Sequence, residues 1–172
     1  MTRLAFASVL LLFAGCASTP PVPPAPPAPL TTATPQAIVA GIRAAAGDDD
    51  AELTVQPLRD PRVEGLRQQA SRLETQGRYA DAAAALDQAL AIVPEDPALL
   101  QERAETALLL GDNTGAEARA RHAFALGAKV GPLCRRHWET VRQVRLLSGD
   151  AAGAQAAQRD REACKVAGPA RY

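Results

Sequence analysis

The chain has 172 residues and a formal net charge of zero, and this length is enough for one small domain with flanking segments. Alanine is the commonest residue and only 3% of the residues are aromatic, which favours closely packed helices over a sandwich or barrel rich in β-branched residues. The charge is unevenly placed, because residues 47–102 hold 12 acidic and 5 basic residues (net −7) and residues 103–172 hold 7 acidic and 12 basic residues (net +5). This polarity excludes a uniformly basic surface and leaves two interpretations, charge scattered over solvated helix faces or a polar partner surface.

The segment from Met1 to Cys16 is typical of an export signal that ends in a cysteine. Arg3 precedes an apolar run over residues 4–13, which is too short to span a bilayer stably as a helix but suits a secretory signal. The segment Phe13-Ala14-Gly15-Cys16 then resembles a bacterial lipobox, with phenylalanine where that family more often has leucine. The alternative is an ordinary signal peptide with a chance cysteine, cut at a nearby small-residue site.

The lipobox resemblance implies where the mature protein is held. Residues 1–15 are then removed as a lipoprotein signal peptide, and Cys16 becomes a diacylated N-terminus that anchors the chain stably to a membrane. Ala17 rather than aspartate follows the cysteine, which by resemblance to envelope lipoproteins implies sorting to the outer membrane. We therefore expect a bacterial protein that is anchored in the outer membrane and faces the periplasm.

A proline-rich stretch separates this anchor from the rest of the chain. Seven of the ten residues over 20–29 are proline, a composition that adopts extended polyproline II rather than helix or sheet. Ile38, Val39 and Ile42 are spaced for one weak helical turn. We interpret residues 16–62 as a flexible tether whose length sets how far the following domain reaches from a membrane.

From Val63 the pattern becomes helical. The stretch from Gly77 to Pro94 predicts a sharp turn, a helix with small residues on its buried face, and a stop, because glycine permits the turn and proline forbids continuation. One such helix cannot bury its own face, so it needs helical neighbours. The Gly-x4-Ala spacing of its turn occurs three times, at Gly77 and Ala82, at Gly111 and Ala116, and at Gly149 and Ala154.

The interval from Gly77 to Gly111, and the slightly longer one from Gly111 to Gly149, resemble the period of the tetratricopeptide repeat family. The resemblance covers about residues 63–165 and implies an all-α fold, a short superhelix of about three helical hairpins, with residues 166–172 as a tail. The four additional residues of the third repeat nearly equal one helical turn, so we expect a longer first helix that starts at Gly131-Pro132. Trp138 fits the repeat pattern, whereas the arginines that follow it suit the polar face of a capping repeat.

Two cysteines frame the third turn. Gly149 lies midway along the chain between Cys134 and Cys164. If Gly149 is the turn of a helical hairpin, both cysteines fall at its open end, where antiparallel helices bring them side by side. An exported compartment can be oxidising, and with Cys16 acylated no thiol is left over. We therefore expect a Cys134–Cys164 disulfide, and the alternative is two buried free thiols.

The sequence lacks the motifs of catalysis and of cofactor or metal binding. It contains no Gly-rich phosphate loop, no serine elbow, no paired-cysteine motif and no His-Glu-x-x-His. Cys134 and His137 have the spacing of one ligand pair without a second, and the acidic run 48–50 lacks the spaced ligands of a calcium loop. The arginines of the third repeat have no interleaved aromatics on which bases could stack. We expect no enzyme activity, no cofactor, no metal and no nucleic-acid partner.

The repeat family binds peptides or protein segments in a concave groove that is lined by the first helix of each hairpin. By this resemblance eight residues face the groove, and the alternative for each of them is plain surface. The eight residues are Arg67, Ser71, Glu74, Gln101, Glu105, Arg136, Glu139 and Gln143. Three repeats make a short groove, which suits one partner helix or one extended segment.

The order of lipobox, proline-rich tether and small repeat domain with a stapled last hairpin resembles the outer-membrane lipoprotein activators of class A penicillin-binding proteins, of the LpoP type. This resemblance of architecture implies a protein partner, a peptidoglycan synthase held in the inner membrane, and a role in cell-wall synthesis. We expect a monomer that acts through its repeat domain. The alternative is an assembly factor for pilus, secretin or outer-membrane protein complexes, although such lipoproteins usually carry more repeats and shorter tethers.

Overall fold

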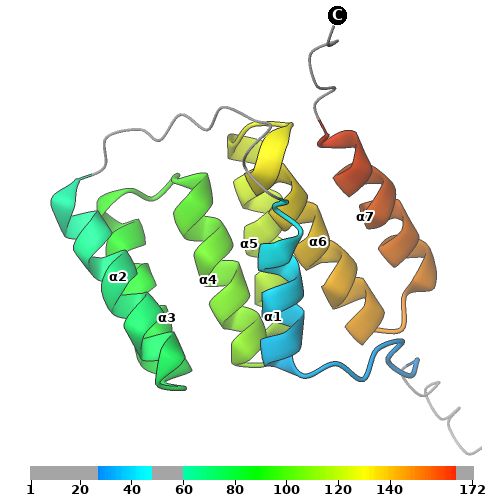
Figure 1. Cartoon of the computed structure of the whole chain (residues 1–172), viewed down its shortest axis with the longest axis horizontal. Helices are drawn as coiled ribbons and strands as arrows, with labels where there is room; N and C mark the ends of the chain where they lie inside the picture. The colour runs from blue at the N-terminus through cyan, green and yellow to red at the C-terminus, as the bar shows by residue number, and fades with distance from the viewer. Residues whose placement is uncertain (1–26, 48–59, 166–172) are drawn as a thin grey trace, which may run out of the picture.

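The computed structural model of the chain describes residues 27–47 and 60–165. Within these two ranges the chain is all-helical, and its helices lie side by side in an array (Figure 1). They are α1 (Pro35–Ala44), α2 (Pro61–Thr75), α3 (Tyr79–Ile92), α4 (Pro97–Leu109), α5 (Asn113–Leu126), α6 (Gly131–Leu147) and α7 (Ala151–Ala163). None of these described helices is long and apolar enough to cross a membrane. The lipobox with Cys16 and the expected tail lie outside the described residues.

Helices α2 to α7 form three hairpins, α2–α3, α4–α5 and α6–α7, which confirms the predicted repeat architecture. Each hairpin turns at a glycine with positive φ, 73° at Gly77, 78° at Gly111 and 75° at Gly149. At the first turn the Arg78 N–H donates to the Leu73 carbonyl at 2.9 Å, and the other two turns repeat this bond. Such a helix end needs a residue in the left-handed conformation, which glycine adopts because it has no Cβ.

The third hairpin differs from the others in length, as its spacing predicted. Helix α6 has 17 residues and α4 has 13, so four more residues lengthen α6 by about one turn and keep its buried face in phase. Pro132 lies in the first turn of α6, where its missing N–H removes no helical hydrogen bond. Val141 and Val144 are buried, and the ring of Trp138 lies 4.9 Å from that of Phe124.

Small side chains allow the helices of the array to approach closely. Ala82, Ala89 and Ala116 are 0% exposed, and Ala154 is 5% exposed. In α3 the first two pack in one cluster with apolar residues of α2 and α4. Because protein interiors are close-packed, a larger side chain at these positions would push the neighbouring helices apart.

Helix α1 corrects the predicted start of the folded domain. The sequence interpretation placed residues 16–62 in a flexible tether, but residues 35–44 form a helix that packs on α4 and α6. Its apolar residues Ile38, Val39 and Ile42 are at most 3% exposed. They share a cluster with residues of α4, α5 and α6, namely Ala107, Leu108, Ala116 and Val144. A helix this short is unstable alone, so contacts with distant helices stabilise it, and no local pattern could indicate them.

A disulfide joins Cys134 of α6 to Cys164, the residue that follows α7, with their Cα atoms 5.7 Å apart. Both residues lie at the open end of the last hairpin, opposite the Gly149 turn. Beside the disulfide, the Gly131 N–H donates to the Cys164 carbonyl at 2.8 Å. The end of α7, which lies at the edge of the array in Figure 1, is thereby tied to the start of α6.

Candidate functional site

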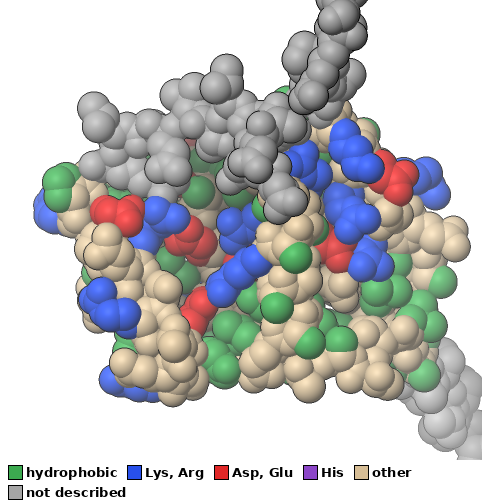
Figure 2. Space-filling view, viewed as in Figure 1, with side chains coloured by type: hydrophobic (Ala, Val, Ile, Leu, Met, Phe, Trp, Pro, Cys, Tyr) green, Lys and Arg blue, Asp and Glu red, His purple; other side chains and the backbone are tan. Residues whose placement is uncertain are grey.

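The first helices of the three hairpins, α2, α4 and α6, form one face of the array, which we name the groove face. Helix α1 lies on this face, antiparallel to α6 (Figure 1). Just before α1, the Leu30 N–H donates to the Leu146 carbonyl near the end of α6, and just after α1, the Ala46 carbonyl accepts from Arg135 near the start of α6. Beside α1, toward α2, a cavity of about 490 Å³ remains open. Figure 2 shows acidic and basic side chains together in this hollow.

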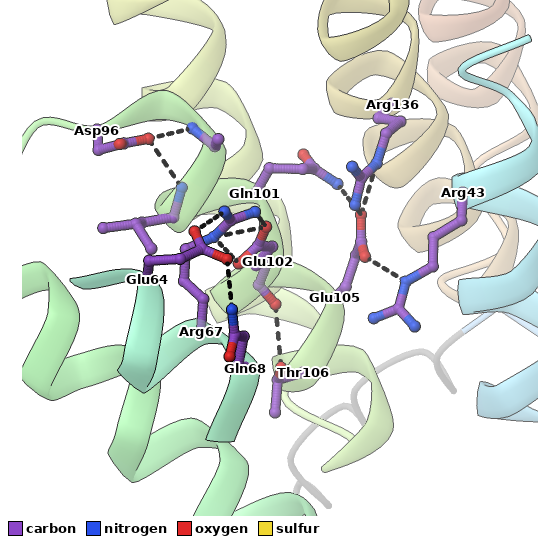
Figure 3. Close-up of polar contacts among 12 residues, drawn as sticks. Arg43, Glu64, Arg67, Gln68, Asp96, Gln101, Glu102, Glu105, Thr106 and Arg136 are labelled. Carbon is purple, nitrogen blue, oxygen red and sulfur yellow. Dashed lines mark hydrogen bonds and ion pairs between the residues drawn. The ribbon is translucent and has the colours of Figure 1, made fainter. Parts of the chain in front are cut away.

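Glu105 of α4 stands at the centre of an ion-pair network at the edge of this cavity (Figure 3). Its carboxylate is fully buried and accepts from Arg43 Nε of α1 at 2.8 Å and from Arg136 Nε of α6 at 3.1 Å. Gln101, one turn earlier in α4, donates to the same carboxylate at 2.8 Å. A buried carboxylate is costly unless it is paired and hydrogen-bonded, and Glu105 has three donors.

Arg43 extends the network from α1 to α2. Its Nη2 donates to Glu74 of α2 at 2.8 Å, and Glu74 also accepts from Thr106 Oγ1 at 2.8 Å. Burial alone would lower the pKa of Arg43, but the carboxylates of Glu105 and Glu74 outweigh burial and raise that pKa above its ordinary value. One connected set of charges therefore joins α1, α2, α4 and α6.

His137 of α6 continues the network into the core. The side chain is 1% exposed, and its Nδ1 lies 2.7 Å from the Gln101 Oε1. The Gln101 amide nitrogen donates to Glu105 and to Thr140, so its oxygen is left to accept and the His137 Nδ1 must carry the proton. Burial, together with the charges of two nearby basic side chains, lowers the pKa of His137 to about 3.

Acid is therefore expected to destabilise the domain through His137. The imidazole stays neutral in the folded chain down to about pH 3, but in the unfolded chain it takes up a proton near pH 6.5. Between these values the unfolded state binds more protons, so the free energy of unfolding falls as the pH is lowered, by about 2 kcal/mol from pH 7 to pH 5. Urea unfolding across this range measures the slope. In His137→Asn, whose amide can still donate to Gln101 but does not titrate, the slope should largely vanish, and an unchanged slope would contradict the prediction.

A second ion-pair group lines the cavity from α2. Arg67 reaches Glu102 of α4 with two nitrogens, of which Nε lies 2.9 Å from Oε2, and its Nη1 donates to Glu64 at 2.9 Å (Figure 3). The hydrogen bonds from Arg67 to Glu102 raise the pKa of Arg67 above its ordinary value. The cavity walls thus carry paired charges of both signs.

A third group joins α6 to α7. Glu139 is buried and accepts from Arg142 at 2.7 Å, from Gln143 at 2.8 Å and from Arg161 of α7 at 2.6 Å. Burial alone would raise the pKa of Glu139, but the hydrogen bonds from Arg142 and Gln143 outweigh it and hold that pKa below its ordinary value. Glu139 therefore links α6 to α7 through its ion pair with Arg161.

The eight predicted groove residues fall into three sets in the structure. Four of them line the cavity beside α1, namely Arg67, Ser71, Glu74 and Arg136. Three predictions are corrected, because Gln101 and Glu105 are 0% exposed and Glu139 is 2% exposed, so none of these is open to a partner. Gln143 donates to Glu139 and lies away from the cavity lining.

The physical reason for the correction is that the groove face is already partly covered. The repeat resemblance implies an open groove, whereas α1 lies across its α4–α6 part and Arg43 covers Glu105.

Sequence reasoning also missed Arg43, Glu64 and Glu102 in the cavity wall. The i, i+3 spacing of Glu64 and Arg67 could have indicated one ion pair. Nothing local could indicate Arg43, whose partners lie 31 and 62 residues away.

The side chains that line this site provide hydrogen-bonding groups and paired charges. Within the described ranges, no group of three or more His, Cys, Asp or Glu side chains is placed to hold a metal ion. His137, whose pKa is strongly lowered, is enclosed in the core and does not line the cavity.

Comparison with known proteins places the chain in a family. The tetratricopeptide repeat family model matches residues 63–106, which span most of α2, all of α3 and most of α4. The solved structure of the globular C-terminal domain of P. aeruginosa LpoP is 30% identical in sequence and matches with a TM-score of 0.58, covering 61% of this chain and 99% of that chain. No curated protein matches the chain. The repeat hairpins and this match over the whole LpoP domain show that the chain belongs to the LpoP-like family of tetratricopeptide-repeat proteins.

Proposed function

We propose that the chain is a lipid-anchored periplasmic protein-binding module that activates, or acts as an adaptor for, a peptidoglycan synthase of the class A penicillin-binding type. The observation that carries the proposal is the 30% sequence identity to the LpoP C-terminal domain, 99% of which is covered by the match. The order of segments in this chain, which resembles that of the LpoP-type activators, supports it further. Tetratricopeptide hairpins form protein-interaction domains, which supports a protein partner.

The proposal assigns a role to each segment. Cys16 carries the lipid anchor at the outer membrane, the residues from 17 to 26 form the tether, and residues 27–165 form the binding domain, which acts as a monomer. The partner segment lies in the cavity beside α1, against Arg67, Ser71, Glu74 and Arg136. The paired charges and exposed serine of that cavity support a polar segment of the synthase as its ligand.

A stimulation assay tests this proposal. The purified chain from residue 17 to 172 should raise glycan polymerisation by the class A enzyme of the same organism. Ser71→Arg, which places a long cation in the cavity, is expected to weaken binding of the synthase about tenfold, or ~1.4 kcal/mol. The matched control is Gln88→Arg on the exposed surface of α3, which should bind as the unchanged chain does. Absence of stimulation, or equal loss in both variants, would contradict the proposal.

The tether and the partner are tested separately. Deletion of residues 20–26, which keeps the segment before Leu30 that lies against the Gly149 turn, should impair function in cells and leave stimulation by the purified domain unchanged, because a spacer acts only across a distance. Crosslinking in cells followed by mass spectrometry should recover the synthase. Recovery of a secretin or pilus protein without a synthase would favour an assembly factor instead.

A further inference from the structure

Helix α1 occupies the groove face without belonging to the repeat array. It precedes the first hairpin in the sequence, yet it lies on the second and third hairpins, against α4 and α6 (Figure 1). It has ten residues, one of which is Gly41, and an isolated helix of that length and composition is unstable in water. The helical form of this segment therefore depends on the surface beneath it, which we name the α1 seat.

The apolar part of the α1 seat is a floor of small and aliphatic side chains. Ile38, Val39 and Ile42 of α1 enter it, and Ile42 is 0% exposed. The buried residues of the floor are Ala107, Leu108, Ala116 and Val144, and Leu109 and Leu147 pack against them. On the opposite side of α1, Ala37, Ala40 and Ala44 are exposed, so no described element packs over that side. The flanking residues add two hydrogen bonds to α6, from the Leu30 N–H to Leu146 and from Arg135 to the Ala46 carbonyl. The contact is thus one-sided, like that of an amphipathic helix bound in a groove.

The polar part of the α1 seat is a pair of carboxylates at one end. Arg43 donates to Glu105 at 2.8 Å and to Glu74 at 2.8 Å, while its own side chain is 45% exposed. Without α1, Glu105 would keep its hydrogen bonds from Arg136 and Gln101. Glu74, whose side chain is 12% exposed, would keep its hydrogen bond from the Thr106 hydroxyl. Both carboxylates therefore keep hydrogen-bond donors when α1 leaves, so the seat can exist empty and accept another helix.

We propose that α1 is a built-in and exchangeable ligand of the groove face, which a helix of the partner protein with the same chemistry displaces. That helix is amphipathic, with β-branched aliphatic residues at positions i, i+1 and i+4 and an arginine at i+5, and it lies antiparallel to α6. Arg43 also lines the open cavity, so departure of α1 joins the α1 seat and the cavity into one longer groove. The inference rests on the proposed function, because it takes the groove face as the partner-binding surface.

A peptide copy of α1 tests the exchange without any synthase. The probe is a fluorescent peptide of residues 34–47, which includes Thr34, whose Oγ1 accepts from the Ala37 N–H at the helix start. It is added to the full chain and to two variants that release α1, Ile42→Asp and Arg43→Glu. The matched control is Ala37→Asp, which adds the same charge to the exposed side of α1. Anisotropy gives the dissociation constant, and amide hydrogen exchange at residues 34–47 reports release.

The peptide should bind both release variants at least about tenfold more tightly than it binds the unchanged chain or Ala37→Asp. In the latter two chains the tethered α1 competes with the peptide for the α1 seat at an effective concentration on the order of millimolar. A peptide with Ile42→Asp should not bind. Equal binding to all four chains would overturn the proposal, and so would loss of the cooperative urea transition in both release variants, since α1 would then be an integral part of the fold. Because no synthase is present, failure of this test is distinguishable from failure of the stimulation assay.

Discussion

Alanine in place of Glu105 is expected to lower the free energy of unfolding by about 3 kcal/mol, the lower end of the range for breaking a buried ion pair. The substitution leaves the guanidinium groups of Arg43 and Arg136 without their shared carboxylate and removes one acceptor of the Gln101 amide. The lower end applies because the two arginine side chains are 45% and 23% exposed and can turn toward water. Urea unfolding followed by circular dichroism at neutral pH measures the change.

A surface ion pair provides the matched control for Glu105→Ala. Asp87 accepts from Arg103 at 2.8 Å, but its side chain is 54% exposed, so Asp87→Ala should cost less than about 1 kcal/mol. Glu105→Gln keeps the shape and most hydrogen bonds of the glutamate and should fall between the two. If the two alanine variants lose equal stability, the network around Glu105 does not hold α1, α4 and α6 together.

Reduction of the Cys134–Cys164 disulfide is expected to lower the free energy of unfolding by about 3.5 kcal/mol. The bond joins residues separated by 30 positions, and the chain-entropy relation for a loop of that size gives this figure from the freedom denied to the unfolded chain. Both cysteines are at most 1% exposed, and the reduced residues remain small apolar side chains in the same packing. Reduction therefore acts mainly by increasing the conformational freedom of the unfolded chain.

The disulfide prediction is measured on a Cys16→Ser chain, so that no third thiol contributes. Its urea transition is compared with and without reductant. The variant that carries both Cys134→Ala and Cys164→Ala should unfold at the same urea concentration in either condition, and close to the reduced chain. A decrease in the free energy of unfolding of under about 1 kcal/mol on reduction would contradict the prediction, and it would mean that the unfolded chain is already compact at this end.

The repeat array could be predicted from the sequence because its determinants are local. A glycine at each turn provides the left-handed residue that ends a first helix, and alanines at fixed distances after it set the close contact between helices. The four-residue excess of the third repeat appears directly as the longer α6. Each of these features lies within one hairpin, so spacing along the chain was enough.

The candidate site was predictable only in part, because its parts come from separate hairpins. Arg67, Ser71 and Glu74 of α2 were found from the repeat pattern and do line the cavity. Glu105 and Gln101 have the same repeat positions on α4, but they are buried beneath Arg43 and beside His137. Position within a repeat indicates which way a side chain points, and it does not indicate what another segment places over it.

The sequence by itself determined the all-α class, the three hairpins, their turns and the length of α6, because helical spacing and glycine conformation are properties of neighbouring residues. Only the tertiary structure decided that residues 35–44 belong to the folded domain. Ile38, Val39 and Ile42 are too few to specify a stable helix, and the surface that buries them is formed by residues of α4, α5 and α6, far later in the chain. The same long-range contact determines which part of the groove face is covered and which part remains open.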